Sequence, residues 1–176
     1  MSTFDSLEFT EVEVPPVLAA QVSGQSTPDP AAIGKAMGVT FGQLMAFEKQ
    51  HKLAPAGPPR CIYTAHSPKE IKFIVAIPIA KPLAKPIKAG PGSVQSLPGG
   101  KAMRFTHRGP YANLRNTYGQ ITEFLKAKGL MKTEADWAKY MPMWEEYLND
   151  PRTTPEADLL TFIYLPMMLT TDRNWR

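Results

Sequence analysis

Residues 41–44 read Phe-Gly-Gln-Leu and residues 118–121 read Tyr-Gly-Gln-Ile, so one short pattern occurs twice in this chain of 176 residues. A phenylalanine follows each copy at the same distance, at positions 47 and 124. Further along the chain, Tyr63 in the first half corresponds to Tyr147 in the second half. This agreement in spacing and identity predicts that the chain duplicates one structural unit.

The first copy of the pattern lies in a segment with helical periodicity. Asp29-Pro30 is typical of a helix start, because aspartate accepts hydrogen bonds from free amides and proline fits the first turn. Apolar residues then recur at three- and four-residue steps, which predicts a helix over residues 30–50. They are Ile33, Met37, Phe41, Leu44 and Phe47. Three glycines at four-residue spacing, Gly34, Gly38 and Gly42, indicate close packing of this helix on a sheet.

The second copy lies in a segment with the same character. Gly109-Pro110 begins a predicted helix that ends near Gly129, after two lysines suited to a helix C-terminus. Its apolar face consists of Leu114, Tyr118, Ile121 and Leu125. Residues 133–136 resemble a capping box, which predicts a short helix around Trp137.

Alternating segments surround both helices and predict strands. We interpret residues 7–22 as one strand interrupted by a bulge at Pro15-Pro16. The other predicted strands span residues 59–65, 71–79, 101–107, 142–148 and 159–166. Two β-α-β-β units, over about 6–80 and 93–168, therefore predict a single α+β domain across residues 1–176. We expect pseudo-twofold symmetry, an antiparallel sheet with helices on one side, and a concave ligand cleft.

Composition excludes some kinds of site and of protein, and the charges are unevenly distributed along the chain. The lone Cys61 excludes an internal disulfide and a cysteine-based zinc site, and no apolar run is long enough for a membrane span. We expect a soluble cytoplasmic protein with no cofactor and no metal. Residues 1–34 carry acids without bases, whereas residues 71–122 carry eight bases without acids.

A basic segment is one feature of proteins that bind nucleic acid, but the pattern of residues here does not favour that function. We interpret Lys81-Pro82 and Lys85-Pro86 as a solvated, extended connector, because no aromatic residue interleaves the lysines between positions 81 and 101. Six residues precede Leu7 and eight follow Met168, so we expect no helix-turn-helix and no direct DNA binding.

Three segments resemble the GyrI-like superfamily, which includes the effector-binding domains of AraC- and MerR-type bacterial transcription regulators. They are His107-Arg108-Gly109-Pro110-Tyr111, Trp144-Glu145-Glu146-Tyr147-Leu148-Asn149-Asp150-Pro151, and Thr161-Phe162-Ile163-Tyr164-Leu165-Pro166. The resemblance covers roughly residues 6–168. It implies a twice-repeated β-α-β-β fold whose concave cleft binds small organic molecules, often amphipathic or cationic, through an acidic residue.

The strand over residues 142–148 supplies the first candidate site residues. Alternation places Glu145 and Tyr147 on one face, and we assign Trp144 and Leu148 to the face under the helices. Glu145 is the candidate polar anchor, because a partly buried carboxylate attracts cations strongly, and the ring of Tyr147 adds cation–π attraction. The alternative is that Glu145 is a hydrogen-bonded structural carboxylate.

Internal symmetry and the resemblance extend this candidate site. Tyr63 should face the cleft from the other half, and Cys61 matches Glu145 in position but is expected to be a packed residue rather than a nucleophile. Tyr111 and Trp137 are further candidates for ligand contact, with a core role as the alternative. Glu146 and Phe162 depart from the family pattern, which usually has an apolar residue and a second glutamate there.

Several functions remain open at this point. The leading hypothesis is a stand-alone small-molecule binding protein, either a monomer or a homodimer. A second is a hydrolase of cyclopropane-bearing DNA-alkylating natural products, with Glu145 as the catalytic base. A third is a protein-interaction role such as inhibition of DNA gyrase. Haem binding would need His51, His66 or His107, for which surface or capping roles are expected.

Overall fold

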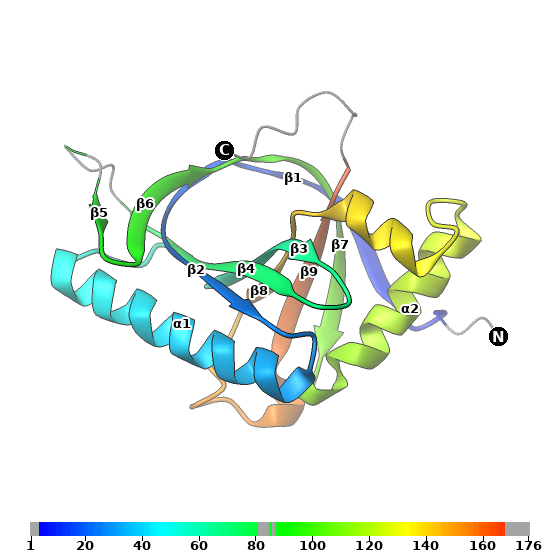
Figure 1. The fold of residues 1–176 in the computed structure, drawn as a ribbon. Helices are drawn as coiled ribbons and strands as arrows, with labels where there is room; N and C mark the ends of the chain where they lie inside the picture. The colour runs from blue at the N-terminus through cyan, green and yellow to red at the C-terminus, as the bar shows by residue number, and fades with distance from the viewer. Residues whose placement is uncertain (1–3, 81–84, 86, 168–176) are drawn as a thin grey trace.

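The computed structural model of the chain describes residues 4–80, 85 and 87–167, and it contains a nine-stranded antiparallel sheet. Two helices, α1 (Pro30–His51) and α2 (Leu114–Ala127), lie on one side of this sheet (Figure 1). The strands are β1 (Glu8–Val14), β2 (Val17–Ser26), β3 (Arg60–His66), β4 (Ile71–Pro78), β5 (Lys88–Ala89), β6 (Gly92–Leu97), β7 (Gly100–Arg108), β8 (Met143–Tyr147) and β9 (Leu160–Pro166). Short 3-10 helices are η1 (Tyr111–Asn113), η2 (Glu134–Tyr140) and η3 (Glu156–Asp158).

The strand order confirms the predicted duplication. The sheet runs β1-β7-β9-β8-β3-β4-β2-β6-β5, so the unit β2-α1-β3-β4 and the unit β7-α2-β8-β9 have mirrored strand orders that meet where β3 pairs with β8. The five strands predicted from residue 59 onward match β3, β4, β7, β8 and β9 within one residue at each end. The predicted end of the second unit at Met168 lies outside the described residues.

The prediction of one bulged strand over residues 7–22 is wrong. β1 pairs with β7 of the second unit, whereas β2 pairs with β4 and β6 of the first, so the chain crosses between the units at Pro15-Pro16. Prolines lack the N–H that a ladder needs, and two in succession end the pairing. The unpredicted strand β6 makes the reciprocal exchange, because it pairs with β2 before the chain enters β7.

The two crossover segments lie against each other at Gly99. A Cβ atom built on this glycine would be 2.2 Å from the carbonyl oxygen of Val14 and 2.7 Å from the nitrogen of Pro16. Only a residue without a side chain allows this approach of backbone to backbone. Figure 1 shows β1, β2, β6 and β7 curving into a ring on the side of the sheet away from the helices.

The exchange of strands brings part of the acidic segment of the chain beside part of the basic segment. Acidic β1 lies beside basic β7, with Arg108 Nε 2.7 Å from Glu8 Oε1 and Glu13 opposite Lys101 in the register. Opposite charges on neighbouring strands favour this pairing. Of the predicted connector, Lys81-Pro82 and Pro86 lie outside the described residues.

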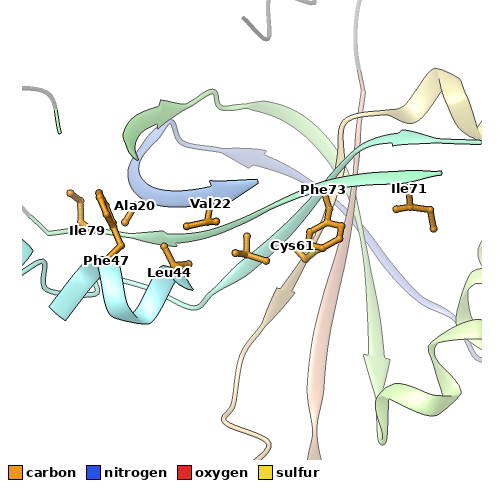
Figure 2. Close-up of a cluster of buried hydrophobic side chains, with 9 residues drawn as sticks. Ala20, Val22, Leu44, Phe47, Cys61, Ile71, Phe73 and Ile79 are labelled. Atoms are coloured by element: carbon orange, nitrogen blue, oxygen red, sulfur yellow. The ribbon is translucent and has the colours of Figure 1, made fainter. Parts of the chain in front are cut away.

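Helix α1 begins as predicted, but its glycines do not pack as predicted. Asp29 Oδ2 accepts a hydrogen bond of 2.8 Å from the amide of Ala32, and Leu44 and Phe47 pack against the sheet (Figure 2). Gly34, Gly38 and Gly42 are exposed, with open space where a side chain would stand, so the interpretation of close helix–sheet packing is wrong. A four-residue spacing identifies a shared stripe of the helix but not the direction in which that stripe points.

The cap at Asp29 gives a first testable prediction. Asp29→Ala should lower the free energy of unfolding by about 1 kcal/mol, because one helix-terminal amide loses its acceptor. Urea unfolding followed by circular dichroism measures the change. Asp29→Asn is the control, since its side-chain oxygen also caps; an equal loss in both variants would contradict a capping role.

Candidate ligand-binding site

The alternation of β8 places Glu145 and Tyr147 on the helix face of the sheet, between α1 and α2. Tyr118 of α2 bonds to Glu145, and the ring of Phe41 in α1 lies 6.3 Å from that of Tyr147. Trp144 packs on the opposite face, stacked on Tyr164 at 4.8 Å. The assignment of Trp144 to the face under the helices is therefore wrong, because alternation separates two faces without indicating which one the helices cover.

Three tyrosine hydroxyls surround the carboxylate of Glu145. Tyr118 donates to Oε1 at 2.6 Å, and Tyr147 donates to Oε2 at 2.6 Å. Tyr63 makes a longer contact of 3.5 Å with Oε2. Only 3% of Glu145 is exposed, whereas the three tyrosines are half-buried. The carboxylate thus lies beneath aromatic rings contributed by α2, β8 and β3.

A second layer of aromatic rings extends this cluster. The ring of Tyr111, at the start of η1, lies 5.5 Å from that of Tyr147. Trp137 of η2 lies 5.8 Å from Tyr118 and donates its indole N–H to Thr122 Oγ1 at 3.3 Å. The predicted capping box at Thr133–Asp136 is present and orients η2. The structure therefore brings together all five predicted site residues, Glu145, Tyr147, Tyr63, Tyr111 and Trp137.

Sequence reasoning missed Tyr118, which it treated only as part of the apolar face of a helix. Its counterpart in the first half is Phe41, so the second half carries a hydroxyl where the first half does not. A hydroxyl on an otherwise apolar helix face indicates a buried polar partner, since a buried Tyr O–H usually finds one.

Burial dominates the electrostatics of the cluster. It raises the pKa of Glu145 above the ordinary value of a glutamate, although the three tyrosine hydrogen bonds and the charge of His107 act in the opposite direction. Burial and the negative charge of Glu145 raise the pKa values of Tyr63, Tyr118 and Tyr147 well above normal. The tyrosines therefore stay protonated as hydrogen-bond donors.

Cys61 lies directly opposite Glu145 in the pairing of β3 with β8 and is fully buried. Burial and the charge of Glu145 raise the pKa of its thiol well above normal. A nucleophilic cysteine needs the reverse, a stabilised thiolate. The prediction that Cys61 is a packed residue is confirmed.

His107 is buried behind the site rather than exposed. Its Nε2 lies 3.1 Å from the carbonyl oxygen of Pro110, which only accepts, so Nε2 donates and Nδ1 meets the hydroxyl of Thr117 at 2.7 Å. Both ring nitrogens are thus engaged near the start of the second helix, but neither meets a helix-terminal amide, so the expectation of a surface or capping role for His107 is wrong. Among the described residues, no three His, Cys, Asp or Glu side chains are grouped to hold a metal ion.

The opposite face of the sheet holds both residues that depart from the family pattern. Glu146 Oε2 lies 3.2 Å from Arg60 Nε, and Phe162 is opposite Glu146 in the register. Position 162 therefore does not face Glu145, so the absence of a glutamate at this position does not remove a carboxylate from the surroundings of Glu145.

Two surface depressions lie away from Glu145. One, of about 370 Å³, is lined by residues of β2 and β4 such as Gly24 and Lys72, and the other lies between Phe47 and Gly90. The aromatic cluster itself is closed over the carboxylate in this conformation, with two tyrosine hydroxyls at 2.6 Å.

Comparison with known families agrees with this fold. A model of the GyrI-like small molecule binding domain matches residues 7–168. The chain belongs to the GyrI-like family. Among the described residues of this GyrI-like domain, no helix has both the length and the apolar character of a membrane span. A comparison with curated protein sequences finds no match.

Solved structures share the fold of this GyrI-like domain at low sequence identity. The EcmrR C-terminal domain is 18% identical with a TM-score of 0.69, and the match covers 91% of this chain and 96% of that one. SAV2435 bound to tetraphenylphosphonium is 11% identical with a TM-score of 0.59, covering 90% and 93%. A hydrolase from Listeria innocua is 13% identical with a TM-score of 0.55, covering 90% and 91%. At these identities the likeness concerns the fold.

Proposed function

We propose that this GyrI-like domain binds lipophilic organic cations, with Glu145 as the anionic anchor and the surrounding aromatic rings as the walls. One observation carries the proposal: a carboxylate that is 3% exposed accepts hydrogen bonds from neutral tyrosines, and no ion pair of the described residues includes it. Its charge is therefore available to a ligand, in a place where water screens it weakly.

The aromatic rings add affinity and select for shape. Tyr147 and Tyr118 donate their hydroxyls to the carboxylate, so a cation that binds Glu145 lies next to both aromatic side chains. Cation–π attraction favours charge that is spread over an apolar body. Since the rings close over Glu145, ligand entry requires the half-buried tyrosines to move apart.

The experiment is a calorimetric titration with tetraphenylphosphonium, the compound in the SAV2435 structure, beside neutral triphenylphosphine oxide. We expect binding of the cation at least about tenfold tighter than binding of the neutral compound, because only the cation gains the attraction of Glu145. Equal binding of the two would refute a role for charge. Absence of binding by both compounds would refute the proposed ligand class.

The pH dependence of this affinity follows from the raised pKa of Glu145. Protonation removes the anchor, so affinity for tetraphenylphosphonium should fall as pH falls, about tenfold per pH unit below the pKa of the folded state. Because burial raises that pKa, the fall begins at a higher pH than for an ordinary glutamate. Titrations between pH 4.5 and 8 in one buffer system measure it; a flat profile would contradict the role of Glu145 as an anchor with a raised pKa.

Hydrolysis is a second candidate function, favoured by the same raised pKa, because a carboxylate with a pKa above its ordinary value is a stronger general base. The structural neighbour described as a hydrolase has the same fold. Incubation with a cyclopropane-bearing DNA-alkylating natural product, followed by mass spectrometry, should reveal an added water molecule; unchanged substrate would exclude this activity. Inhibition of DNA gyrase stays a prediction. A DNA supercoiling assay with gyrase and micromolar concentrations of this protein tests it.

A further inference from the structure

The face of the sheet opposite the helices carries a second polar and aromatic cluster, separate from Glu145. Two adjacent rows of the register contribute its members. The row of Arg60, Glu146 and Phe162 lies next to the row of Trp144, Tyr164 and Arg104. We refer to these six residues as the back-face cluster.

Contacts within the back-face cluster are close and mixed in kind. Arg60 pairs with Glu146, and the hydroxyl of Tyr164 reaches Glu146 Oε1 at 3.4 Å. The guanidinium of Arg104 lies over the ring of Phe162 at 4.3 Å, and that of Arg60 lies 6.0 Å from the Trp144 ring. Flat cationic groups thus alternate with aromatic rings across the face.

Polar atoms of this face lack hydrogen-bond partners although they are buried. They include two donors of the cluster, Nε of Arg104 and Nε1 of Trp144, and one acceptor in the row of Arg60, Oε1 of Gln21. Arg60 and Trp144 are 9% and 7% exposed. Nε of Arg60 has a partner, because it lies 3.2 Å from Glu146 Oε2 in an ion pair. Buried donors without acceptors are costly, so a group that supplies acceptors here gains free energy.

The charge of the back-face cluster indicates which kind of ligand would bind there. Two guanidiniums, those of Arg60 and Arg104, accompany the single carboxylate of Glu146, so the cluster has an excess of positive charge and favours an anion over a cation. Guanidinium groups bind carboxylates through paired hydrogen bonds. The stacked pair of Trp144 and Tyr164, with Phe162 beside it, favours a flat aromatic body attached to the anionic group.

We propose that the back-face cluster is a second binding site, which takes small aromatic carboxylates. Arg104 and Phe162 are half-buried, so the ligand reaches the cluster over these two side chains. On the side of the cluster away from Arg104 and Phe162, the site is limited by the crossover segments that meet at Gly99. Val14 and Leu97 of these segments belong to the same buried cluster as Trp144 and Tyr164. The site therefore lies across the sheet from Glu145 and has the opposite charge preference.

The test uses 2-naphthoate as the probe and neutral 2-naphthamide as its uncharged counterpart, in calorimetric titrations of the full chain. We expect 2-naphthoate to bind, and Arg104→Gln to weaken it at least about tenfold, as loss of a charged hydrogen bond implies. Arg115→Gln, an exposed arginine on α2, is the control for net charge and should leave affinity unchanged. Phe162→Leu keeps the charge and should also weaken binding.

Two further readouts locate the ligand. The indole N–H resonance of Trp144, assigned through Trp144→Phe, should shift with 2-naphthoate but not with 2-naphthamide. Glu145→Gln should leave 2-naphthoate affinity unchanged, which separates this site from the proposed cation site. The proposal is overturned if 2-naphthoate and 2-naphthamide bind equally, if 2-naphthoate does not bind at millimolar concentration, or if folded Arg104→Gln and Phe162→Leu bind it like the wild type.

Discussion

Glu145→Gln should weaken tetraphenylphosphonium binding by about thirtyfold or more. Removing one member of a buried charge pair costs about 2 kcal/mol or more, and each 1.4 kcal/mol is about a factor of ten in affinity. Glutamine has nearly the same size and retains an oxygen that accepts from Tyr118 or Tyr147, so the aromatic walls stay in place. The loss therefore reports on the charge of the anchor rather than on the shape of the site.

A matched variant and a second measurement make this result decisive. Glu11→Gln removes the same charge from an exposed position on β1 and should bind like the wild type. The affinity of Glu145→Gln should also be independent of pH across the range in which the wild type changes. Full binding by a folded Glu145→Gln protein would support the alternative, in which Glu145 is a structural carboxylate.

Gly99→Ala should lower the free energy of unfolding by about 3 kcal/mol, the upper part of the range for overpacking. The added methyl group would meet the carbonyl oxygen of Val14 at 2.2 Å and the backbone at Pro15-Pro16. Backbone atoms held in two crossover segments cannot rotate away as the end of a side chain can. The clash must be relieved by separating the crossovers, which disturbs the pairing of β1 with β7 and of β6 with β2.

Gly119→Ala is the natural comparison for this variant. Gly119 lies inside α2 with no other atom within 4 Å of the position of a Cβ, so alanine should stabilise the protein by up to about 1 kcal/mol through helix propensity. Thermal and urea unfolding measure both variants. Gly99→Ala as stable as the wild type would show that the crossovers are not in contact.

Local patterns predicted the elements of this fold well, because their causes lie within a few residues. The cap at Asp29, the capping box at Thr133–Asp136 and the alternation in residues 142–148 act between near neighbours in the chain. The repeated pattern at Phe41 and Tyr118 also predicted the duplicated unit correctly. The five site candidates came from this alternation, the internal symmetry and the family resemblance together.

Other features depend on contacts between distant segments, and no local pattern encodes them. The exchange of β1 and β6 between the two units requires pairing across the whole sheet, and Pro15-Pro16 alone is compatible with a bulge or a crossover. The face that the helices cover, and the placement of Tyr118 over Glu145, are likewise set by packing. Residue order determined the elements and the side chains available to a site. Tertiary packing then decided that Glu145 lies beneath tyrosines and that Glu146 pairs with Arg60. Burial raises the pKa of both carboxyl groups, and this effect depends on the atoms that surround a residue in space rather than on its neighbours in sequence.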